Sequence, residues 1–325
     1  MDKSATIIKP IKIDFEKFQK IYTTEFQSGN PLLSAVYNHL LASKGKQIRP
    51  ILTLLSAKLF GQITETTYRI AMGLEMLHAA SLIHDDVVDE TLVRRGNESV
   101  NSAFSNKIAV LCGDYILSRV LSIAGELNDN RYIKAFASLG ESLSDGELLQ
   151  IINAKELSFS EEKYFEVIEK KTAVLFQTCL YLGALSSGTS YNKKVEDIKL
   201  FGFYLGICFQ IKDDIFDYFD SKKIGKPTAN DIREKKVTLP LLYALSKADK
   251  QEFGEIKKLF QQTQLSQEDI QYLISFAKNK GGIQYAEKLM VEYKEKAIAL
   301  LQSFDNEEIK QSLIGVLEYS IDRGK

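Results

Sequence analysis

The 325-residue sequence is poor in cysteine and almost without net charge, and each shortage excludes a class of protein. Its three cysteines, Cys112, Cys179 and Cys208, are odd in number and show no Cys-x-x-Cys spacing. A disulfide framework and a zinc site are therefore not expected, and a reducing, cytoplasmic location fits best. Lys plus Arg (42) nearly equals Asp plus Glu (43), so the net charge of −1 favours neither nucleic acid nor an anionic membrane as partner.

Prolines are also few, and their positions predict the fold class. The five prolines leave the whole stretch from Ile51 to Lys226 without one. Because proline breaks helix interiors, so long a run rich in Leu, Ala, Ile, Glu and Lys is typical of long helices. Period-2 alternation with β-branched residues is nearly absent. The sequence therefore predicts an all-α protein.

Apolar spacing and stop signals place the expected helices along the chain. They span residues 12–27, 31–43, 49–60, 65–90, 101–126, 130–154, 160–187, 194–221 and 237–248, with shorter ones to 321. No linker rich in Pro, Gly or Ser divides them, so residues 1–325 are expected to form one bundle domain, with 1–28 as an N-terminal helical extension. We expect no signal peptide at the charged N-terminus, and no transmembrane segment at Thr172–Asn192, whose firmly apolar part is only Ala173 to Leu185.

Two of the expected long helices end in the same acidic motif. The segments SLIHDDVVDE at 81–90 and CFQIKDDIFD at 208–217 each contain DDxxD. One copy could be a solvated helix end, but negative charge at a helix C-terminus opposes the macrodipole, and two copies need a cause. On helical spacing the first and last aspartates of each motif lie one turn apart on one face. The carboxylates are those of Asp85, Asp86, Asp89, Asp213, Asp214 and Asp217.

The chemistry of these side chains predicts a metal site. If the two clusters face each other, carboxylates so close together stay ionised only when cations hold them. Oxygen ligands without His or Cys select magnesium, or manganese, over zinc. Because magnesium prefers one or two carboxylates together with water and phosphate oxygens, we expect a phosphorylated substrate.

Basic residues near the ends of the two acidic helices support that expectation. Arg grips phosphate with a planar fork, and Lys gives an adjustable point charge. Each cation alone could be a solvated surface charge, but two separate groups would suit two phosphorylated substrates. The residues concerned are Lys46, Arg49, Arg94, Arg95, Lys226 and Lys236.

Both DDxxD motifs, the GKxxRP segment at 45–50 and the order of these motifs resemble the trans-type polyprenyl diphosphate synthases, over about residues 30–325. The sequence departs from that family where it reads Lys-Gly-Lys-Gln at 44–47 instead of Gly-Gly-Lys-Arg, and Lys-Lys at 235–236 instead of Gly-Lys. The resemblance implies an all-helical bundle of the isoprenoid synthase type, with a central cavity between the two Asp-rich helices. It also implies a magnesium-dependent prenyltransferase, usually a homodimer, that condenses farnesyl, geranyl or dimethylallyl diphosphate with isopentenyl diphosphate.

The same resemblance assigns roles to individual residues. The six aspartates would bind magnesium on the allylic diphosphate. That diphosphate would also be contacted by Arg94, Lys171, Lys226 and Lys236. Isopentenyl diphosphate would be held by Lys46, Arg49, His78 and Arg95. Thr172 and Gln210 would line the reacting carbons. Without the resemblance, His78 could be a hydrogen-bonding core residue and Lys171 a solvated helix end.

The helix before Asp85 predicts the length of the product. Family members with short products commonly carry an aromatic residue just before the first motif, whereas here Ala80 and Ser81 are small and Leu77 follows one turn deeper. Phe136, or Leu139, is the expected floor. We therefore predict a medium- or long-chain all-trans polyprenyl diphosphate, as used for quinone side chains. The alternatives are a farnesyl or geranylgeranyl diphosphate synthase, with Ala80 and Ser81 serving only close helix packing, or less well a terpene cyclase or a non-catalytic synthase subunit.

Overall fold

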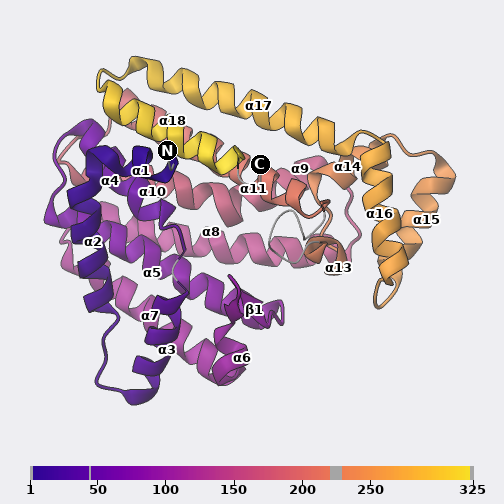
Figure 1. Ribbon diagram of the computed structural model, residues 1–325, viewed down its shortest axis with the longest axis horizontal. Helices are drawn as coiled ribbons and strands as arrows, with labels where there is room; N and C mark the ends of the chain where they lie inside the picture. The colour runs from indigo at the N-terminus through magenta and orange to yellow at the C-terminus, as the bar shows by residue number, and fades with distance from the viewer. Residues whose placement is uncertain (1–2, 44, 220–228, 323–325) are drawn as a thin grey trace. The chain divides into compact units, whose positions relative to one another are not determined.

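The computed structural model describes residues 3–43, 45–219 and 229–322, in which nearly all regular structure is helical (Figure 1). The prediction of an all-α fold is confirmed. The first half of the chain contains α1 (Lys3–Ile8), η1 (Lys9–Ile11), α2 (Lys12–Glu25), α3 (Pro31–Ala42), α4 (Ile48–Phe60), α5 (Glu65–Val88), β1 (Val93–Arg94), β2 (Asn97–Glu98), α6 (Val100–Phe104), α7 (Asn106–Glu126) and α8 (Asn130–Lys155). The second half contains α9 (Glu161–Ile168), η2 (Glu169–Ala173), α10 (Val174–Ser186), α11 (Lys193–Phe216), α13 (Asn230–Arg233), α14 (Leu239–Ser246), α15 (Lys250–Gln261), α16 (Gln267–Asn279), α17 (Gly282–Leu300), η3 (Leu301–Ser303) and α18 (Glu307–Asp322).

The expected helices agree with these bounds to within about three residues, with a few exceptions. The helix expected at 194–221 ends at Phe216, so Asp217 lies just beyond it. The helix expected at 101–126 is divided at Ser105, whose φ of 113° is incompatible with a continuous helix. The helix expected at 160–187 contains a π-helical turn, η2, which shifts the register between α9 and α10. An antiparallel two-residue hairpin, β1–β2, follows the first acidic motif, and the sequence had given no signal for it.

The chain forms two compact units. Of the described residues, unit 1 comprises those within 1–141, 175–202 and 301–316, and unit 2 comprises those within 142–174, 203–300 and 317–325. The helices α8, α10, α11 and α18 contribute residues to both. That residues 1–325 form one synthase domain, with 1–28 as an extension, stays a prediction.

Unit 1 is built around α5, which packs against α4 and lies alongside α7 (Figure 1). Residues 70–77 of α5 are all buried, and Ile70, Leu74 and Met76 completely so, as expected for a helix at the centre of a bundle. Close packing also needs small residues. A methyl group on Gly183 of α10 would lie 2.4 Å from the carbonyl oxygen of Thr53 on α4, so only glycine fits there.

The N-terminal helix α2 is packed onto this unit rather than detached from it. Its side chains Phe15, Phe18 and Tyr22 are buried. Asp14 accepts a hydrogen bond of 2.7 Å from the Tyr68 hydroxyl of α5. At the other end of α2, Glu25 pairs with Arg119 of α7. The predicted extension therefore contributes to the core of unit 1.

In unit 2, α14 packs against both α16 and α17. A methyl group on Gly282 would lie 2.1 Å from the carbonyl oxygen of Pro240, so this glycine allows α17 to start directly on α14. The Tyr243 and Tyr285 rings stack with centroids 4.2 Å apart. Nearby, the hydroxyls of Tyr218 and Thr238 are 2.6 Å apart, which fixes the start of α14 to the segment after α11.

The charge-free stretch that the sequence analysis rejected as a membrane span is a buried core helix, α10, as expected. Among the described residues, one helix, α7, is long and apolar enough to cross a membrane by length and composition, and 39% of its most apolar window is buried. Core helices pass the same test, so this composition is weak evidence for a membrane.

Candidate active site

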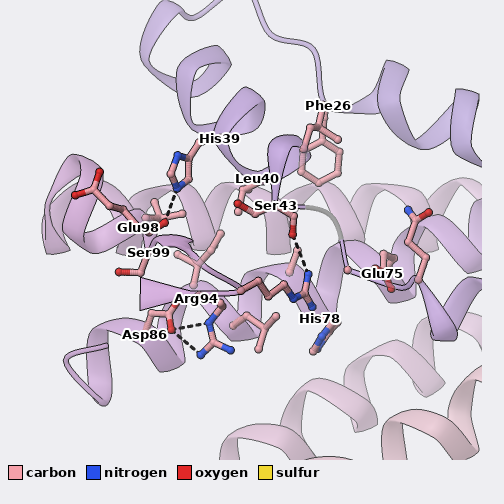
Figure 2. A pocket seen from close by; sticks show the side chains of 18 of the residues that line it. Phe26, His39, Leu40, Ser43, Glu75, His78, Asp86, Arg94, Glu98 and Ser99 are labelled. Carbon is pink, nitrogen blue, oxygen red and sulfur yellow. Dashed lines mark hydrogen bonds and ion pairs between the residues drawn. The ribbon is translucent and has the colours of Figure 1, made fainter. Parts of the chain in front are cut away.

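The first acidic motif occupies the end of α5. Asp86 is almost completely buried, at 2% exposure, and Asp85 is half-buried. The Arg94 side chain holds Asp86 Oδ1 with Nε at 2.7 Å and Nη2 at 2.6 Å (Figure 2). Removing a carboxylate from water is costly unless it is paired. Arg94, which the sequence analysis placed on the allylic diphosphate, therefore neutralises the first acidic motif here.

The hairpin after α5 sets the direction of two arginines. Its turn residues, Arg95 and Gly96, have φ of 53° and 79°, the left-handed region that glycine tolerates best. Nη1 of Arg95 donates to the backbone oxygen of Ser43 at 3.2 Å. A methyl group on Gly45 would lie 2.6 Å from the same Nη1. The glycine of the GKxxRP segment thus leaves room for the Arg95 guanidinium against the backbone.

These groups line a pocket of about 710 Å³ in unit 1 (Figure 2). Of the residues predicted for substrate or metal, it brings together His78, Asp86, Arg94 and Arg95, whereas Lys46 and Arg49 do not line it. Burial lowers the pKa of His78 well below its ordinary value, and the charges of Arg49, Arg95 and Arg94 act in the same direction. The imidazole at this site is therefore neutral.

Arg49 lies close by, in the first turn of α4. Its guanidinium carbon is 5.6 Å from the centre of the Phe176 ring of α10. An aromatic face attracts a guanidinium and limits its rotation. Lys46 is exposed in the preceding loop. The cations predicted for isopentenyl diphosphate thus come from α4, the loop before it and the hairpin.

The second acidic motif, in unit 2, is held by neutral donors. Asp214 is 2% exposed and accepts 2.6 Å and 2.9 Å hydrogen bonds from the Tyr164 hydroxyl and from Gln210 Nε2. The other atom of that amide, Oε1, accepts from the Thr172 hydroxyl at 2.8 Å. Two residues that the sequence placed at the reacting carbons, Thr172 and Gln210, therefore belong to one chain of hydrogen bonds that ends on an acidic motif.

Asp217 is used differently, as a cap for the short helix α13. Its two carboxylate oxygens accept from the backbone N–H groups of Asn230 and Asp231, at 3.1 Å and 2.9 Å. Burial, and then the negative charge of Asp231, raise the pKa of Asp217 to about 7, while the backbone N–H groups lower it. The same two causes raise the pKa of Asp214 well above its ordinary value.

A pocket of about 820 Å³ in unit 2 gathers five further predicted residues, whereas Asp213 and Asp217 do not line it. Lys171, Thr172, Gln210, Asp214 and Lys236 all line it. Lys171 lies in the π-helical turn and pairs with Glu147, while its Nζ donates to Gln150 Oε1 at 3.0 Å. Lys236 pairs with Glu234 at 2.6 Å. Lys226 lies outside the described residues.

Sequence reasoning missed several groups of these pockets. Tyr164 is fifty residues before its partner Asp214 on another helix, so no spacing pattern could connect them. Asp231 lies outside both motifs but adds a third carboxylate near Asp214 and Asp217. Glu75 lies one turn before His78 on α5 and could have been found from helical spacing alone.

The donor chemistry fits a hard divalent cation. The motifs offer carboxylate oxygens and no thiolate, which suits magnesium. Within residues 3–43, 45–219 and 229–322, no group of three or more Asp, Glu, His or Cys side chains is gathered closely enough to hold a metal ion. The buried aspartates instead satisfy their oxygens with Arg94, Tyr164, Gln210 and backbone N–H groups. Binding a cation would therefore exchange these partners for metal.

Comparison with known proteins identifies the family. The family model described as Polyprenyl synthetase matches residues 30–277, most of the chain. The chain belongs to the polyprenyl synthetase family. It is accordingly an enzyme, a prenyltransferase of isoprenoid biosynthesis with the all-α isoprenoid synthase fold, as the resemblance implied.

Individual relatives cover nearly the whole chain. An octaprenyl diphosphate synthase of Haemophilus influenzae is 31% identical over 95% of this chain and 94% of that protein. A geranylgeranyl pyrophosphate synthase structure from Bacteroides thetaiotaomicron is 42% identical, with a TM-score of 0.86 over 99% and 100% of the two chains. A polyprenyl synthase structure from Caulobacter crescentus, complexed with calcium and isoprenyl diphosphate, is 28% identical with a TM-score of 0.92 over 99% and 98%. Divalent metal and isoprenyl diphosphates are thus ligands found in this family.

Proposed function

We propose that this prenyltransferase condenses an allylic diphosphate with successive isopentenyl diphosphates to give a medium- or long-chain all-trans polyprenyl diphosphate. One observation carries the proposal: each of the two pockets combines an aspartate of a DDxxD motif with cationic side chains. Acidic groups suit metal and cationic groups suit diphosphate, so each pocket has the chemistry of a metal–diphosphate site.

The allylic diphosphate would bind at the cations of unit 2. Lys171 and Lys236 would stabilise the charge that develops on the leaving diphosphate, the electrostatic contribution that usually dominates catalysis. Thr172 and Gln210 would line the reacting carbons. The amide of Gln210 is held by Thr172 on one side and Asp214 on the other, so its dipole has a fixed direction. A fixed dipole beside a developing allylic cation costs no reorganisation.

The six aspartates would hold magnesium. When bound, the metal supplies a Lewis acid that withdraws charge from the diphosphate oxygens. Both substrates must meet in one active site, so the proposal retains the expectation from the sequence that the two acidic motifs face each other. No protein base is needed, because the departing diphosphate can accept the proton that the isopentenyl unit loses after the new carbon–carbon bond has formed.

A direct assay tests this function. Purified protein is incubated with isopentenyl diphosphate, an allylic starter (farnesyl, geranyl or dimethylallyl diphosphate) and magnesium, and the product is sized by mass. The expected result is diphosphate release that requires both substrates, together with a series of products that differ by one isoprene unit. Release from the allylic substrate alone would indicate a terpene cyclase, and no release at all would indicate a non-catalytic subunit.

Product length depends on the wall of α5. Leu77 and Ala80 are buried, and the Ser81 hydroxyl donates to the His78 backbone oxygen at 3.0 Å. Deeper on the same helix, a methyl group on Gly73 would lie 2.9 Å from Cζ of Phe136, so the Phe136 ring rests directly on this glycine. Gly73 is twelve residues before Asp85, roughly 18 Å along the helix. Phe136 therefore fits the proposed floor.

The 42% identity to a geranylgeranyl pyrophosphate synthase favours a second candidate, a shorter product. Two variants decide between them. Ala80→Phe should shorten a medium- or long-chain product, because an aromatic ring would close the path near the metal. Phe136→Ala should lengthen the product only if this ring is the floor. Ile133→Ala, an exposed position on the same helix, is the control. A geranylgeranyl product that Phe136→Ala leaves unchanged would refute both the long product and the floor.

Homodimerisation and a cytoplasmic location complete the proposal. Four large apolar side chains of α7 are more than a third exposed: Val110, Leu111, Tyr115 and Leu121. An exposed apolar stripe on a helix is typical of a subunit interface. Sedimentation should therefore give a dimer, and Leu111→Asp should shift it to the monomer. A monomeric native protein would contradict this part of the proposal.

A further inference from the structure

The pocket of unit 2 contains a lysine whose charged end is held by one neighbouring helix. Lys171 lies in the π-helical turn η2 and lines the pocket. Its Nζ forms an ion pair with Glu147 of α8 and donates to Gln150 Oε1 of the same helix at 3.0 Å. Residues at this spacing share one face of a helix. The ammonium group of Lys171 is therefore held by two acceptors from a single face of α8.

The stem of the same lysine also lies against α8. Gly146 is buried, and a methyl group on it would lie 2.7 Å from Cγ of Lys171 and 3.0 Å from the Lys171 backbone nitrogen. Only glycine therefore lets α8 approach the π-helical turn so closely. Contact along the stem removes the rotamer freedom that a lysine side chain ordinarily keeps.

The arrangement leaves one donor of Lys171 for the pocket. An ammonium group has three N–H donors and no acceptor. Glu147 and Gln150 can accept one each, so the third can be donated to a diphosphate oxygen. Lys171 and Gln150 line the pocket, whereas Glu147 does not. The carboxylate is thus not part of the pocket wall, where it would face an anionic substrate directly.

The adjacent lysine of η2 is paired with α8 in the same way but does not line the pocket. Lys170 Nζ donates to Asp145 Oδ2 of α8 at 2.7 Å and to Glu166 Oε1 at 3.1 Å. Neither Asp145 nor Lys170 lines the pocket. This second ion pair therefore anchors η2 to α8 without a direct effect on a bound substrate.

We propose that Glu147 and Gln150 are positioning residues for the allylic diphosphate, which fix the ammonium group of Lys171 so that its third N–H is directed at the substrate. The inference rests on the proposed function. The four-carbon stem of lysine is flexible, and ordering it when a diphosphate binds costs free energy. In this protein α8 orders the side chain in advance.

The sign of the effect distinguishes positioning from competition. If Glu147 only competed with the diphosphate for Lys171, the neutral Glu147→Gln variant would bind the allylic substrate more tightly. If Glu147 positions Lys171, Glu147→Gln binds that substrate more weakly although a repulsive charge is gone. Gln150→Met removes the other acceptor without changing any charge, and it should also weaken binding. A purely structural role would lower the melting temperature and leave the affinity unchanged.

The test is calorimetric binding of farnesyl diphosphate, with magnesium and without isopentenyl diphosphate, together with KM for each substrate. For Glu147→Gln we expect Kd and KM for farnesyl diphosphate to rise about tenfold, the equivalent of one charge-assisted hydrogen bond. Gln150→Met should raise both about threefold, as expected for a neutral acceptor. KM for isopentenyl diphosphate should stay within about twofold in both variants. Asp145→Asn, which removes the carboxylate paired with Lys170, is the matched control and should change none of these constants.

Two further variants keep the test decisive if Glu147→Gln loses stability. Glu147→Asp retains the charge on a shorter side chain and should show an intermediate rise in Kd. In a Lys171→Ala background, Glu147→Gln should raise Kd no further, because the side chain that it positions is gone. Unchanged or tighter binding in Glu147→Gln, an equal loss of affinity in Asp145→Asn, or additive effects in the double variant would overturn the inference. Native enzyme that forms no polyprenyl product from the two substrates would instead refute the proposed function.

Discussion

The two acidic motifs have the same sequence pattern but different partners. In both, the second aspartate is buried at 2% exposure and the first is half-buried. Asp86 is neutralised by a cation, Arg94, whereas Asp214 is held by the neutral donors Tyr164 and Gln210. The buried aspartate of the first motif is therefore paired with a positive charge, and that of the second motif is not.

This difference has a chemical consequence. Arg94 occupies Asp86 Oδ1, so at the first motif an incoming cation competes with this guanidinium. At the second motif burial and the neighbouring Asp231 raise the pKa of Asp214, so an incoming cation relieves an existing repulsion. One motif repeated twice in a sequence can thus present two sites of different electrostatic character.

The largest expected effect comes from removing the half-buried aspartates. Asp85→Ala and Asp213→Ala should each lower kcat by roughly two to three orders of magnitude, the loss typical of a missing group that stabilises transition-state charge. Folding should survive, because removing one carboxylate from a repulsive cluster relieves repulsion. Steady-state assays with saturating magnesium, together with thermal unfolding, measure both quantities. Near-normal turnover in either folded variant would refute the metal assignment for that motif.

The next effect separates the two pockets by substrate. Arg49→Ala should raise KM for isopentenyl diphosphate by about ten- to a hundredfold, since charged hydrogen bonds to phosphate contribute about 1.5 to 3 kcal/mol. Lys171→Ala should instead raise KM for the allylic substrate. Lys163 also lines the unit 2 pocket, so Lys163→Ala is the control for a general loss of positive charge there. The opposite pattern in the two variants would mean that the two sites are exchanged.

The sequence predicted most of the fold because helices leave a local signal. Helix starts at 31, 65 and 130 agree with the structure, since the 3.6-residue apolar period and stop residues such as Gly61 are readable without tertiary information. The break at Ser105 and the π-helical turn at 169–173 could not be predicted. Both are set by packing against neighbouring elements, which overrides local propensity.

The candidate site was predictable only where its residues recur in motifs. The aspartates, Arg94 and Arg95 were found because they share short segments, and the family resemblance added His78, Lys171, Thr172 and Gln210. Their partners were not found. Tyr164, for example, reaches Asp214 from another helix, and such contacts depend on how helices pack. A single sequence contains no local pattern for them.

A smaller effect tests how each buried aspartate is stabilised. Arg94→Ala leaves Asp86 buried without its cation, and Tyr164→Phe removes one donor from Asp214. Each should lower the free energy of unfolding by about 1 to 3 kcal/mol. Magnesium should restore stability in Arg94→Ala more than in Tyr164→Phe, because a cation replaces a lost positive charge but not a lost neutral donor. Denaturant unfolding with and without magnesium measures this, and equal rescue of both variants would contradict the distinction between the motifs.

The smallest effect is a dependence of the unfolding free energy on pH, which arises from His78 in the unit 1 pocket. Burial and the charges of Arg49, Arg95 and Arg94 hold the pKa of His78 well below its ordinary value. As the pH falls below about 6.5, the unfolded chain binds a proton at His78 and the folded chain does not, so the folded state loses stability by up to about 1.4 kcal/mol per pH unit. His78→Gln removes this contribution. The unfolding free energy of the native protein, measured relative to that of His78→Gln, should therefore be constant above pH 7. It should decrease as the pH falls from 6.5 to 5. A difference that stays flat over that range would mean that His78 takes up its proton equally in both states, and that the arginines of this pocket do not control it.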